Sequence, residues 1–338
     1  MVADTVYGHS DTNYGHFGTA CIFEVRFHHQ EHSKKSTKVS KRLQENNRLY
    51  EEVIAMKDAL CVKNLSKSFE DFNLQNISFS IPTGSVMGLI GKNGSGKTTT
   101  IKLILNLLRC QTGSVSVLEM DHIKQEQEFK ERIGVVFDSH FFVDEWKMTD
   151  VEKSMGMFYK HWDSKIFYRY LNDFSIGKNK RVKELSKGMQ MKLMLACSFS
   201  HKAELLILDE PTSGLDPVSR DELLDILIDF TEDQNHSVLF STHITPDLNK
   251  IADSITFINN GKLFYTGKKE DFTEMYLIVS GFQGHLTPDI KSLLLSTKLS
   301  GDHFEGLIKA EHLSKVSHLQ NRQADIDDII VFMNKGEF

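Results

Sequence analysis

The 338-residue sequence has few cysteines, no long apolar run and no excess of basic residues. Its four cysteines (Cys21, Cys61, Cys110 and Cys197) are scattered without a Cys-x-x-Cys pair. This argues against a disulfide framework or a cysteine zinc site and predicts reduced thiols in a cytosolic protein. No apolar run approaches the roughly 18 residues of a membrane-spanning helix, and no secretory signal is visible. The formal net charge of −6 argues against a general nucleic-acid-binding surface.

The first 55 residues differ in pattern from the rest of the chain. They carry glycines and five scattered histidines (His9, His16, His28, His29 and His32), whose irregular spacing argues against a metal site. Residues 33–53 are polar and predict one exposed helix at most. Glu51-Glu52-Val53 can be encoded by a ribosome-binding sequence just before the Met56 codon. We therefore expect residues 1–55 to be a poorly structured extension and a start-site artefact, with the native start at Met56.

From residue 57 onward, short strands alternate with amphipathic helices. The expected strands are 60–65, 77–81, 86–90, 114–118, 133–137, 205–208, 237–240, 255–258 and 262–265. Helices are expected over 97–108, in a stretch from about 140 to 200, over 217–233 and from 246 onward. Residues 290–295 and 325–333 have a helical pattern, so 277–338 is expected to be a small appended α+β unit. This alternation predicts an α/β domain.

The segment 91–98 fits the phosphate-loop pattern G-x-x-x-x-G-K-[ST] between a predicted strand and a predicted helix. Glycines allow the backbone N–H groups to turn inward around an anion, Lys97 reaches the β- and γ-phosphates, and the Thr98 hydroxyl binds Mg²⁺. The residues expected to contact the nucleotide here are Gly91, Asn93, Gly94, Ser95, Gly96, Lys97, Thr98 and Thr99. This motif predicts a nucleoside triphosphate with Mg²⁺.

Two later segments complete the predicted site. Residues 205–210 form an apolar strand that ends in Asp209, expected on Mg²⁺, and Glu210, expected to activate water as a general base. Leu185-Ser186-Lys187-Gly188-Met189 precedes a predicted helix, so it is a second phosphate-binding end. Because one triphosphate does not need two such ends, this end is expected to serve a second molecule.

With these motifs, residues 57–275 resemble the nucleotide-binding subunit of an ATP-binding cassette (ABC) transporter. The resemblance implies a P-loop ATPase domain with an inserted helical subdomain and an antiparallel β subdomain. Leu185, Ser186 and Gly188 match the family signature LSGGQ, whereas Lys187 and Met189 depart from it. Ser213–Asp216 matches the D-loop, which implies that Asp216 crosses a dimer interface. Ser241-Thr242-His243 matches the motif whose histidine contacts the γ-phosphate.

Two assignments carried by the resemblance have open alternatives. The family stacks an aromatic side chain on adenine about 20 residues before the phosphate loop. Phe69 matches this position, and Phe72 is the second candidate. The alternative is that Phe69 is a core residue with no contact to the nucleotide. The family's usual Gln after the next strand is Asp138 here, which can reach Mg²⁺; the alternative is an acidic loop residue without that role.

The resemblance implies a head-to-tail dimer in which Ser186 and Gly188 of one subunit complete the ATP site of the other. The second cassette comes from a homodimer or from a heterodimer with another ABC ATPase. ATP hydrolysis would drive a separate polytopic membrane permease, which places the chain on the cytoplasmic face of the cell membrane; no nucleic-acid partner is expected. Within the family, Asp138, Lys187, Met189 and the segment 241–262 are most similar to ATPases of small bacterial exporters encoded beside GntR-type regulators.

Two other functions compete with this reading. A non-transport ABC ATPase acting on ribosomes or DNA would usually carry two cassettes or long coiled coils, and neither is seen. An inactive regulatory module would not need Lys97, Asp209, Glu210 and His243 together. In the helical stretch, Met148, Met155, Phe158, Tyr159 and Trp162 fit either a docking surface for the membrane subunit or the core of the subdomain.

Overall fold

The computed structural model describes residues 57–335. The predictions made for residues 1–55, including the histidines and the start at Met56, lie outside the described residues. Within 57–335, no helix is both long enough and apolar enough to span a bilayer.

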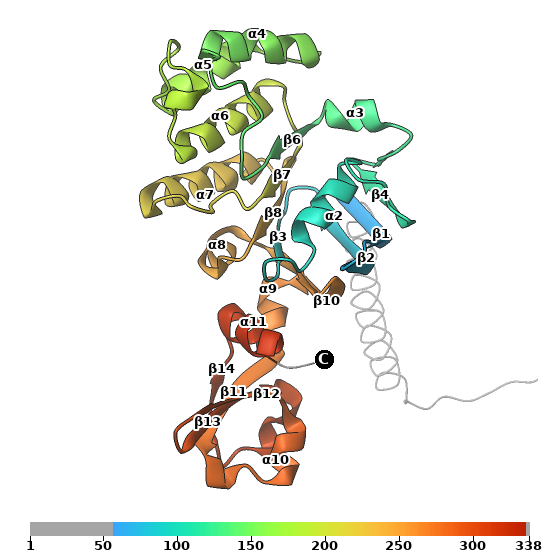
Figure 1. Cartoon of the computed structure of the whole chain (residues 1–338), viewed down its shortest axis with the longest axis vertical. Coiled ribbons are helices and arrows are strands. Elements are labelled where there is room, and N and C mark those ends of the chain that lie inside the picture. The colour runs from blue at the N-terminus through green and yellow to red at the C-terminus, as the bar shows by residue number, and fades with distance from the viewer. Residues whose placement is uncertain (1–56, 336–338) are drawn as a thin grey trace, which may run out of the picture. The chain divides into compact units, whose positions relative to one another are not determined.

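A ten-stranded sheet organises most of this part of the chain, in the order β5-β4-β1-β2-β10-β9-β3-β8-β7-β6 (Figure 1). Its parallel part runs from β9 to β6. The strands of that part are β3 (Val86–Ile90), β6 (Ile133–Val136), β7 (Leu205–Asp209), β8 (Ser237–Thr242) and β9 (Ser254–Asn259). The remaining strands form mainly antiparallel pairs. They are β1 (Asp58–Ser68), β2 (Asn73–Pro82), β4 (Thr112–Val117), β5 (Met120–Asp121) and β10 (Lys262–Lys268). The predicted α/β class and the antiparallel β part are confirmed.

Central strands are buried on both faces, as the continuous apolar runs predict. Every residue of β3, β7 and β8 is buried. Because successive strand residues point to opposite faces, Leu206 and Leu208 join one hydrophobic cluster while Leu205 and Ile207 join another. The parallel strands therefore end together at one edge of the sheet, where their carboxyl-terminal loops can share a site.

Helices cover both faces of the sheet and form the inserted helical block (Figure 1). They are α2 (Lys97–Ile104), α3 (Glu126–Lys130), α4 (Met148–Phe158), α5 (Ser164–Asp173), α6 (Lys187–Ser200), α7 (Pro217–Thr231), α8 (Thr245–Ile251) and α9 (Lys269–Glu274), with the short 3₁₀ turn η1 (Val182–Glu184). The helix expected over 97–108 ends at Ile104, because Asn106 takes a left-handed conformation (φ 54°) that stops helices. The helix expected to reach residue 233 ends at Thr231.

The last part of the described chain forms a four-stranded antiparallel sheet in the order β12-β13-β11-β14. Its strands are β11 (Tyr276–Phe282), β12 (Leu294–Ser300), β13 (His303–Lys309) and β14 (Gln320–Gln323), and its helices are η2 (Gln283–His285), α10 (Pro288–Leu293), η3 (Ala310–Lys315) and α11 (Ile326–Lys335). The prediction of helix up to residue 295 was wrong at its end, since Leu294 pairs with Ile308 as the first residue of β12. The side chains of Thr245 in α8 and Asp327 in α11 are hydrogen-bonded, which joins this unit to the end of the loop after β8.

Candidate functional site

The phosphate loop connects β3 to α2, and its glycines occupy conformations that other residues avoid. Gly91 has a φ of 154°, and a Cβ there would lie 2.3 Å from the Ile258 carbonyl oxygen. Gly94 has a φ of 80° and faces open space. Gly96 caps α2 without a side-chain hydrogen bond, and the first turn of α2 contains no acidic residue. The first amide groups of α2 are therefore free to bind an anion.

Lys97 is the first residue of α2, and only 5% of it is exposed. Its ammonium group donates to the Gly91 carbonyl at 2.8 Å and lies 3.1 Å from Glu210 Oε1. The phosphate loop and the end of β7, more than 100 residues apart in the sequence, thus meet at this cation. Thr98 is exposed beside it and Thr99 is half-buried.

Asp209 and Glu210 lie at the carboxyl end of β7, where Ser241 of β8 holds both. Ser241 Oγ donates to Asp209 Oδ1 at 2.6 Å and accepts from the Glu210 N–H at 2.9 Å. Glu210 has a φ of 52°, a strained conformation for a side chain of this size. Such strain tends to be kept where it positions a functional group. Sequence reasoning missed Ser241 as the bridge; its position in the adjacent parallel strand was the available signal.

His243 brings a third polar side chain to the same point. Its Nδ1 lies 2.7 Å from Glu210 Oε2, so the two oxygens of Glu210 face Lys97 and His243 respectively. One buried polar atom here, Ser95 Oγ, has no hydrogen-bond partner within the described chain, and Glu210 Oε1 has only its ion pair with Lys97. Unsatisfied polar atoms beside an uncapped helix start are expected where a polar ligand completes the site.

The ion pair recorded for Asp138 does not involve the triad of Lys97, Glu210 and His243. Asp138 follows β6, which is parallel to β7 with Val136 opposite Leu208, and its side chain pairs with Lys187. Neither the prediction that Asp138 reaches Mg²⁺ nor the alternative of a loop acid anticipated this ion pair. Within residues 57–335, no group of three or more His, Cys, Asp or Glu side chains is arranged to hold a metal without help from other ligands.

Ser186 and Gly188 lie at the start of α6, away from the phosphate loop's own contacts. Ser186 is the N-cap, and its Oγ accepts from the Met189 N–H at 3.3 Å. Gly188 packs so closely that a Cβ would meet Ser219 at 3.1 Å. Within the described chain, no hydrogen bond or ion pair joins either residue to the phosphate loop.

Asp216 is the N-cap of α7, and its Oδ1 accepts from the Val218 and Ser219 N–H groups at 3.1 Å each. A hydrogen bond from the Ser219 side chain, followed by these backbone bonds, lowers the pKa of Asp216 below its usual range. An Asp directly before Pro217 at the first helical position is itself a capping signal. The role of Asp216 across a dimer interface, which the resemblance implies, is therefore additional to its local role as the N-cap of α7.

The two candidate aromatic residues lie differently. Phe69 is 41% exposed, so it is not a core residue. Phe72 is half-buried and packs beside the phosphate loop, since a Cβ on Gly96 would lie 3.0 Å from its ring. The two ring centroids are 6.4 Å apart.

A buried charge network that sequence reasoning missed lies behind the site. Asp247 in α8 is fully buried and accepts hydrogen bonds from Thr212 Oγ1 and Arg220 Nε, both at 2.6 Å. Thr212 follows Glu210 by two residues, and Arg220 is in α7. The network therefore ties the loop after β7 to α7 and α8.

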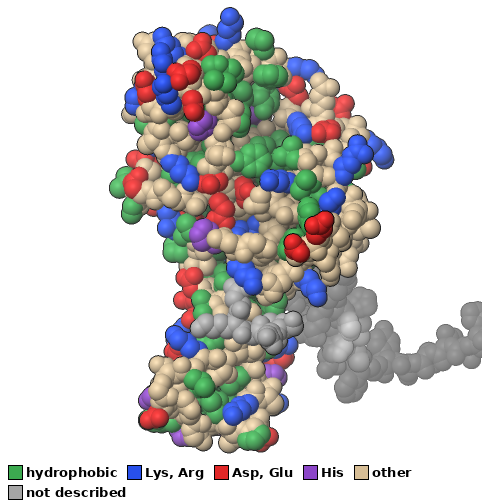
Figure 2. Space-filling model, viewed as in Figure 1, with side chains coloured by type: hydrophobic (Ala, Val, Ile, Leu, Met, Phe, Trp, Pro, Cys, Tyr) green, Lys and Arg blue, Asp and Glu red, His purple; other side chains and the backbone are tan. Residues whose placement is uncertain are grey.

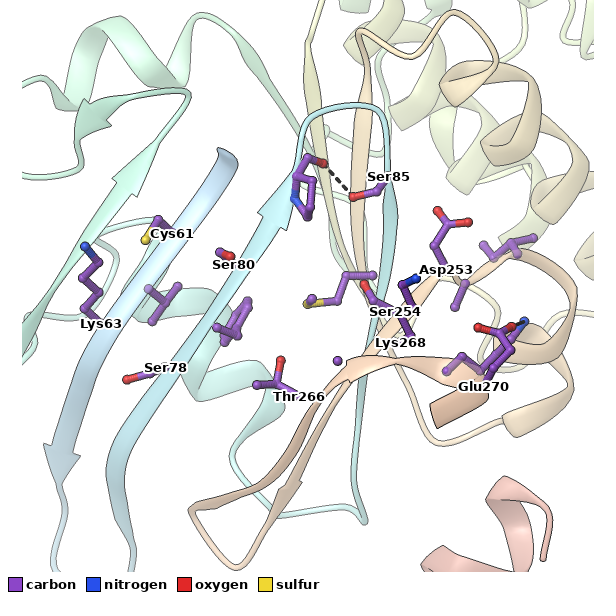
Figure 3. Close-up of a pocket in the computed structure, with 18 of the residues that line it drawn as sticks. Cys61, Lys63, Ser78, Ser80, Ser85, Asp253, Ser254, Thr266, Lys268 and Glu270 are labelled. Carbon is purple, nitrogen blue, oxygen red and sulfur yellow. Dashed lines mark hydrogen bonds and ion pairs between the residues drawn. The ribbon is translucent and has the colours of Figure 1, made fainter. Parts of the chain in front are cut away.

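A pocket of about 960 Å³ opens elsewhere, between β2 and β10 (Figure 3). Figure 3 shows Ser78 and Ser80 of β2 facing it from one strand and Thr266 of β10 from another. None of the residues predicted to contact nucleotide lines this pocket. It is therefore distinct from the site around Lys97.

Comparisons with known proteins identify related sequences and structures. A family model described as ABC transporter matches residues 74–213. The ABC transporter ATP-binding protein NatA of Bacillus subtilis is 32% identical over 228 residues, which cover 64% of this chain and 92% of NatA. The bacitracin transport ATP-binding protein BcrA of Bacillus licheniformis is 28% identical over 197 residues, which cover 56% of this chain and 63% of BcrA. The solved structure of cbiO1 from Clostridium perfringens, part of the ABC transporter complex cbiONQ, aligns with a TM-score of 0.56 and 25% identity, covering 64% of this chain and 91% of cbiO1.

Proposed function

This chain belongs to the family of ABC transporter ATP-binding subunits, and from that premise we propose that it hydrolyses ATP in a two-cassette dimer to power export by a separate membrane protein. The observation that carries the proposal is the convergence of Lys97, Glu210 and His243 at the start of α2. These groups come from three strand ends that adjoin in the parallel sheet. They supply a phosphate-binding cation, a base and a hydrogen-bonding imidazole at one point.

Binding of ATP places its phosphates on the free amide groups of the loop and of α2. Lys97, which now faces Glu210, turns its charge to the β- and γ-phosphates. Thr98, Asp209 and Asp138 are the residues we assign to Mg²⁺, whose hard-cation chemistry suits hydroxyl and carboxylate oxygens. When bound, the metal would offset phosphate charge. We assign adenine stacking to Phe69, because its exposed ring can accept a base.

Hydrolysis then depends on Glu210. Once Lys97 faces phosphate, the carboxylate can accept a proton from the water that attacks the γ-phosphorus, and the bond to the leaving ADP oxygen breaks. His243 donates a hydrogen bond to the γ-phosphate and keeps Glu210 oriented. The Ser241 bridge to the Glu210 backbone holds the base in place during these steps.

The second half of each ATP site comes from another subunit in this proposal. Ser186 and Gly188 have no bond to the phosphate loop of their own chain among the described residues, and the start of α6 is a helix end suited to phosphate. A head-to-tail dimer, of two copies of this chain or with a related ABC ATPase, puts this end on the other subunit's γ-phosphate. Asp216, at the start of α7, would lie near that interface.

The end of α4 is our candidate for the contact with the membrane subunit. Phe158 is 73% exposed and its neighbour Met157 is 78% exposed, whereas Met148 and Met155 are buried in the core. Tyr159 and Trp162 pack partly against that core. The residues predicted for this role thus divide into core residues and an exposed apolar end of α4. Figure 2 shows hydrophobic side chains at the surface of the helical block that holds α4. Exposed apolar side chains of this kind favour a protein contact.

Coupling to transport is supported by the similarity to BcrA, named for bacitracin transport. Export as the direction, and association with the cytoplasmic face of the membrane, are part of our proposal. A membrane partner is supported by the similarity to cbiO1, described as part of a larger complex. The link to GntR-type regulators rests on Asp138, Lys187 and the segment 241–262. We keep 57–275 as the ATPase domain and 277–338 as an appended unit.

Co-purification tests the proposal. The chain from Met56 is expressed with its genomic neighbours, membranes are solubilised gently, and the proteins that accompany it are identified by mass spectrometry. A polytopic membrane protein in near-equal amount is the expected result. Recovery with ribosomes or DNA, or only from the cytosol, would contradict the transport proposal and favour a non-transport ABC ATPase. A Met157→Ser/Phe158→Ser variant should lose the membrane protein while its ATP binding stays unchanged.

A further inference from the structure

Lys187 and Asp138, 49 residues apart in the sequence, form an ion pair between the start of α6 and the loop after β6. Asp138 follows β6, and Lys187 is the first residue of α6. The Lys187 ammonium also lies close to a third loop, because a Cβ on Gly214 would be 3.5 Å from its Nζ. One cation thus joins the loop after β6, the start of α6 and the loop before α7.

The position of the Lys187 backbone is fixed by its neighbours. Gly188 packs tightly against Ser219 at the start of α7, where an added Cβ would lie 3.1 Å from the serine side chain. Ser186 caps the helix on the other side. The ammonium group can therefore change partners by side-chain rotation while its helix stays in place.

The charge of Lys187 is at the unfavourable end of its helix. A helix start carries partial positive charge, which favours anions and disfavours a cation. The first turn of α6 contains no acidic residue. Lys187 therefore needs a counter-anion from outside α6, and in the described state Asp138 provides it.

The Lys187 side chain is about one-third exposed, and the Asp138 side chain is more than one-half exposed. Exposed ion pairs add little to folding stability. Because the stabilising effect is small, the pair can open when a stronger partner arrives. For Asp138, Mg²⁺ is such a partner, and for Lys187 a phosphate is.

We propose that Lys187 is a positioning residue that exchanges Asp138 for phosphate when nucleotide binds. The inference rests on the proposed function. In the nucleotide-free subunit, Lys187 holds Asp138 and restrains it from Mg²⁺. When Asp138 turns toward the metal, Lys187 is released and contributes its charge to the phosphate-binding start of α6, which faces the other subunit's ATP. Filling one site thereby prepares the same chain to complete the second site.

Two experiments test the release of Asp138 and the release of Lys187 separately, and neither requires ATP hydrolysis. Binding of ADP is measured by calorimetry with and without Mg²⁺, for wild type and for Lys187→Gln. The variant should bind Mg²⁺·ADP about two- to fivefold more tightly, the effect of removing an exposed ion pair that competes for Asp138, with no change when Mg²⁺ is absent. Asp138→Asn should weaken only Mg²⁺-dependent binding.

Dimer formation supplies the second readout. In a Glu210→Gln background, added to prevent turnover, ATP-driven dimerisation is followed by analytical ultracentrifugation. Lys187→Gln should weaken dimerisation about tenfold or more, the loss of a charge-assisted contact to phosphate, although it strengthens Mg²⁺·ADP binding. Opposite signs in the two assays are the signature of the exchange, because a general structural defect would weaken both.

Lys183→Gln is the matched control, since Lys183 is an exposed lysine just before α6 that pairs with Glu145. If Lys187→Gln matched Lys183→Gln in both assays, or weakened both kinds of binding, the exchange would be refuted. If wild type itself failed to bind nucleotide, the proposed function would fail instead. The two failures are therefore distinguishable.

Discussion

Replacing Glu210 by glutamine tests the base assignment. The substitution keeps the shape of the side chain and removes its negative charge. In the structure, Oε2 faces His243 Nδ1 at 2.7 Å and Oε1 faces Lys97 Nζ at 3.1 Å. A positioned general base contributes roughly 10²–10⁴ in rate, which corresponds to about 3–5 kcal/mol of activation free energy. Glu210→Gln should therefore slow hydrolysis by two to four orders of magnitude.

Binding should respond in the opposite direction. With the carboxylate gone, Lys97 has no competing anion and is more available to phosphate, so we expect ATP affinity to be retained or increased. ATP should then accumulate in the dimer, because the step that opens it is blocked. Single-turnover phosphate release and size-exclusion chromatography with ATP measure the two effects. Glu222→Gln is the control, because Glu222 is an exposed carboxylate that pairs with Lys192. Hydrolysis by Glu210→Gln at the wild-type rate would refute the assignment.

Two further predictions concern stability. Asp247→Ala leaves Arg220 without its anion and Thr212 without its acceptor in a fully buried place, so it should cost about 3–5 kcal/mol of unfolding free energy. Urea denaturation measures this loss, and exposed Asp221→Ala should cost less than about 1 kcal/mol; equal costs would contradict the network. Burial lowers the pKa of His201 despite hydrogen bonds to two carbonyls, so the folded chain binds fewer protons than the unfolded chain below about pH 6.5. The free energy of unfolding should therefore fall as the pH falls from about 7.5 to about 5.5. His201→Gln should make this fall smaller, and an unchanged pH dependence in the variant would contradict the contribution of His201.

The fold was largely predictable because its central strands obey a simple pattern. Residues of β3 and β7 are apolar in succession, and that pattern specifies strands buried on both faces. Helix ends were less predictable. Asn106 ends α2 through its left-handed backbone, and Leu294 belongs to β12 because of its pairing with Ile308, a long-range contact that local periodicity does not contain.

In the candidate site too, local sequence patterns predict some features, whereas others depend on long-range contacts. The spacing of the phosphate loop and the position of Glu210 after an apolar strand suffice to predict that Lys97 and Glu210 share a site, since parallel strands end at one edge. The pairing of Lys187 with Asp138 was not predictable from spacing. The two residues are far apart in the sequence, and each separately looks like an ordinary surface charge. The burial of Asp247 likewise depends on packing between α7 and α8.

Subunit complementation tests the central claim, that each ATP site combines two chains, most directly. Lys97→Met removes the phosphate-binding cation, and Ser186→Glu places a carboxylate where the other subunit's γ-phosphate is proposed to lie. Each variant alone should be inactive, because both of its sites are defective. Mixed dimers pair the intact phosphate loop of one chain with the intact Ser186 of the other, so an equal mixture should recover up to about a quarter of the wild-type ATPase rate. A mixture no more active than the separate variants, although both are folded and Ser186→Glu still binds ADP, would contradict the account.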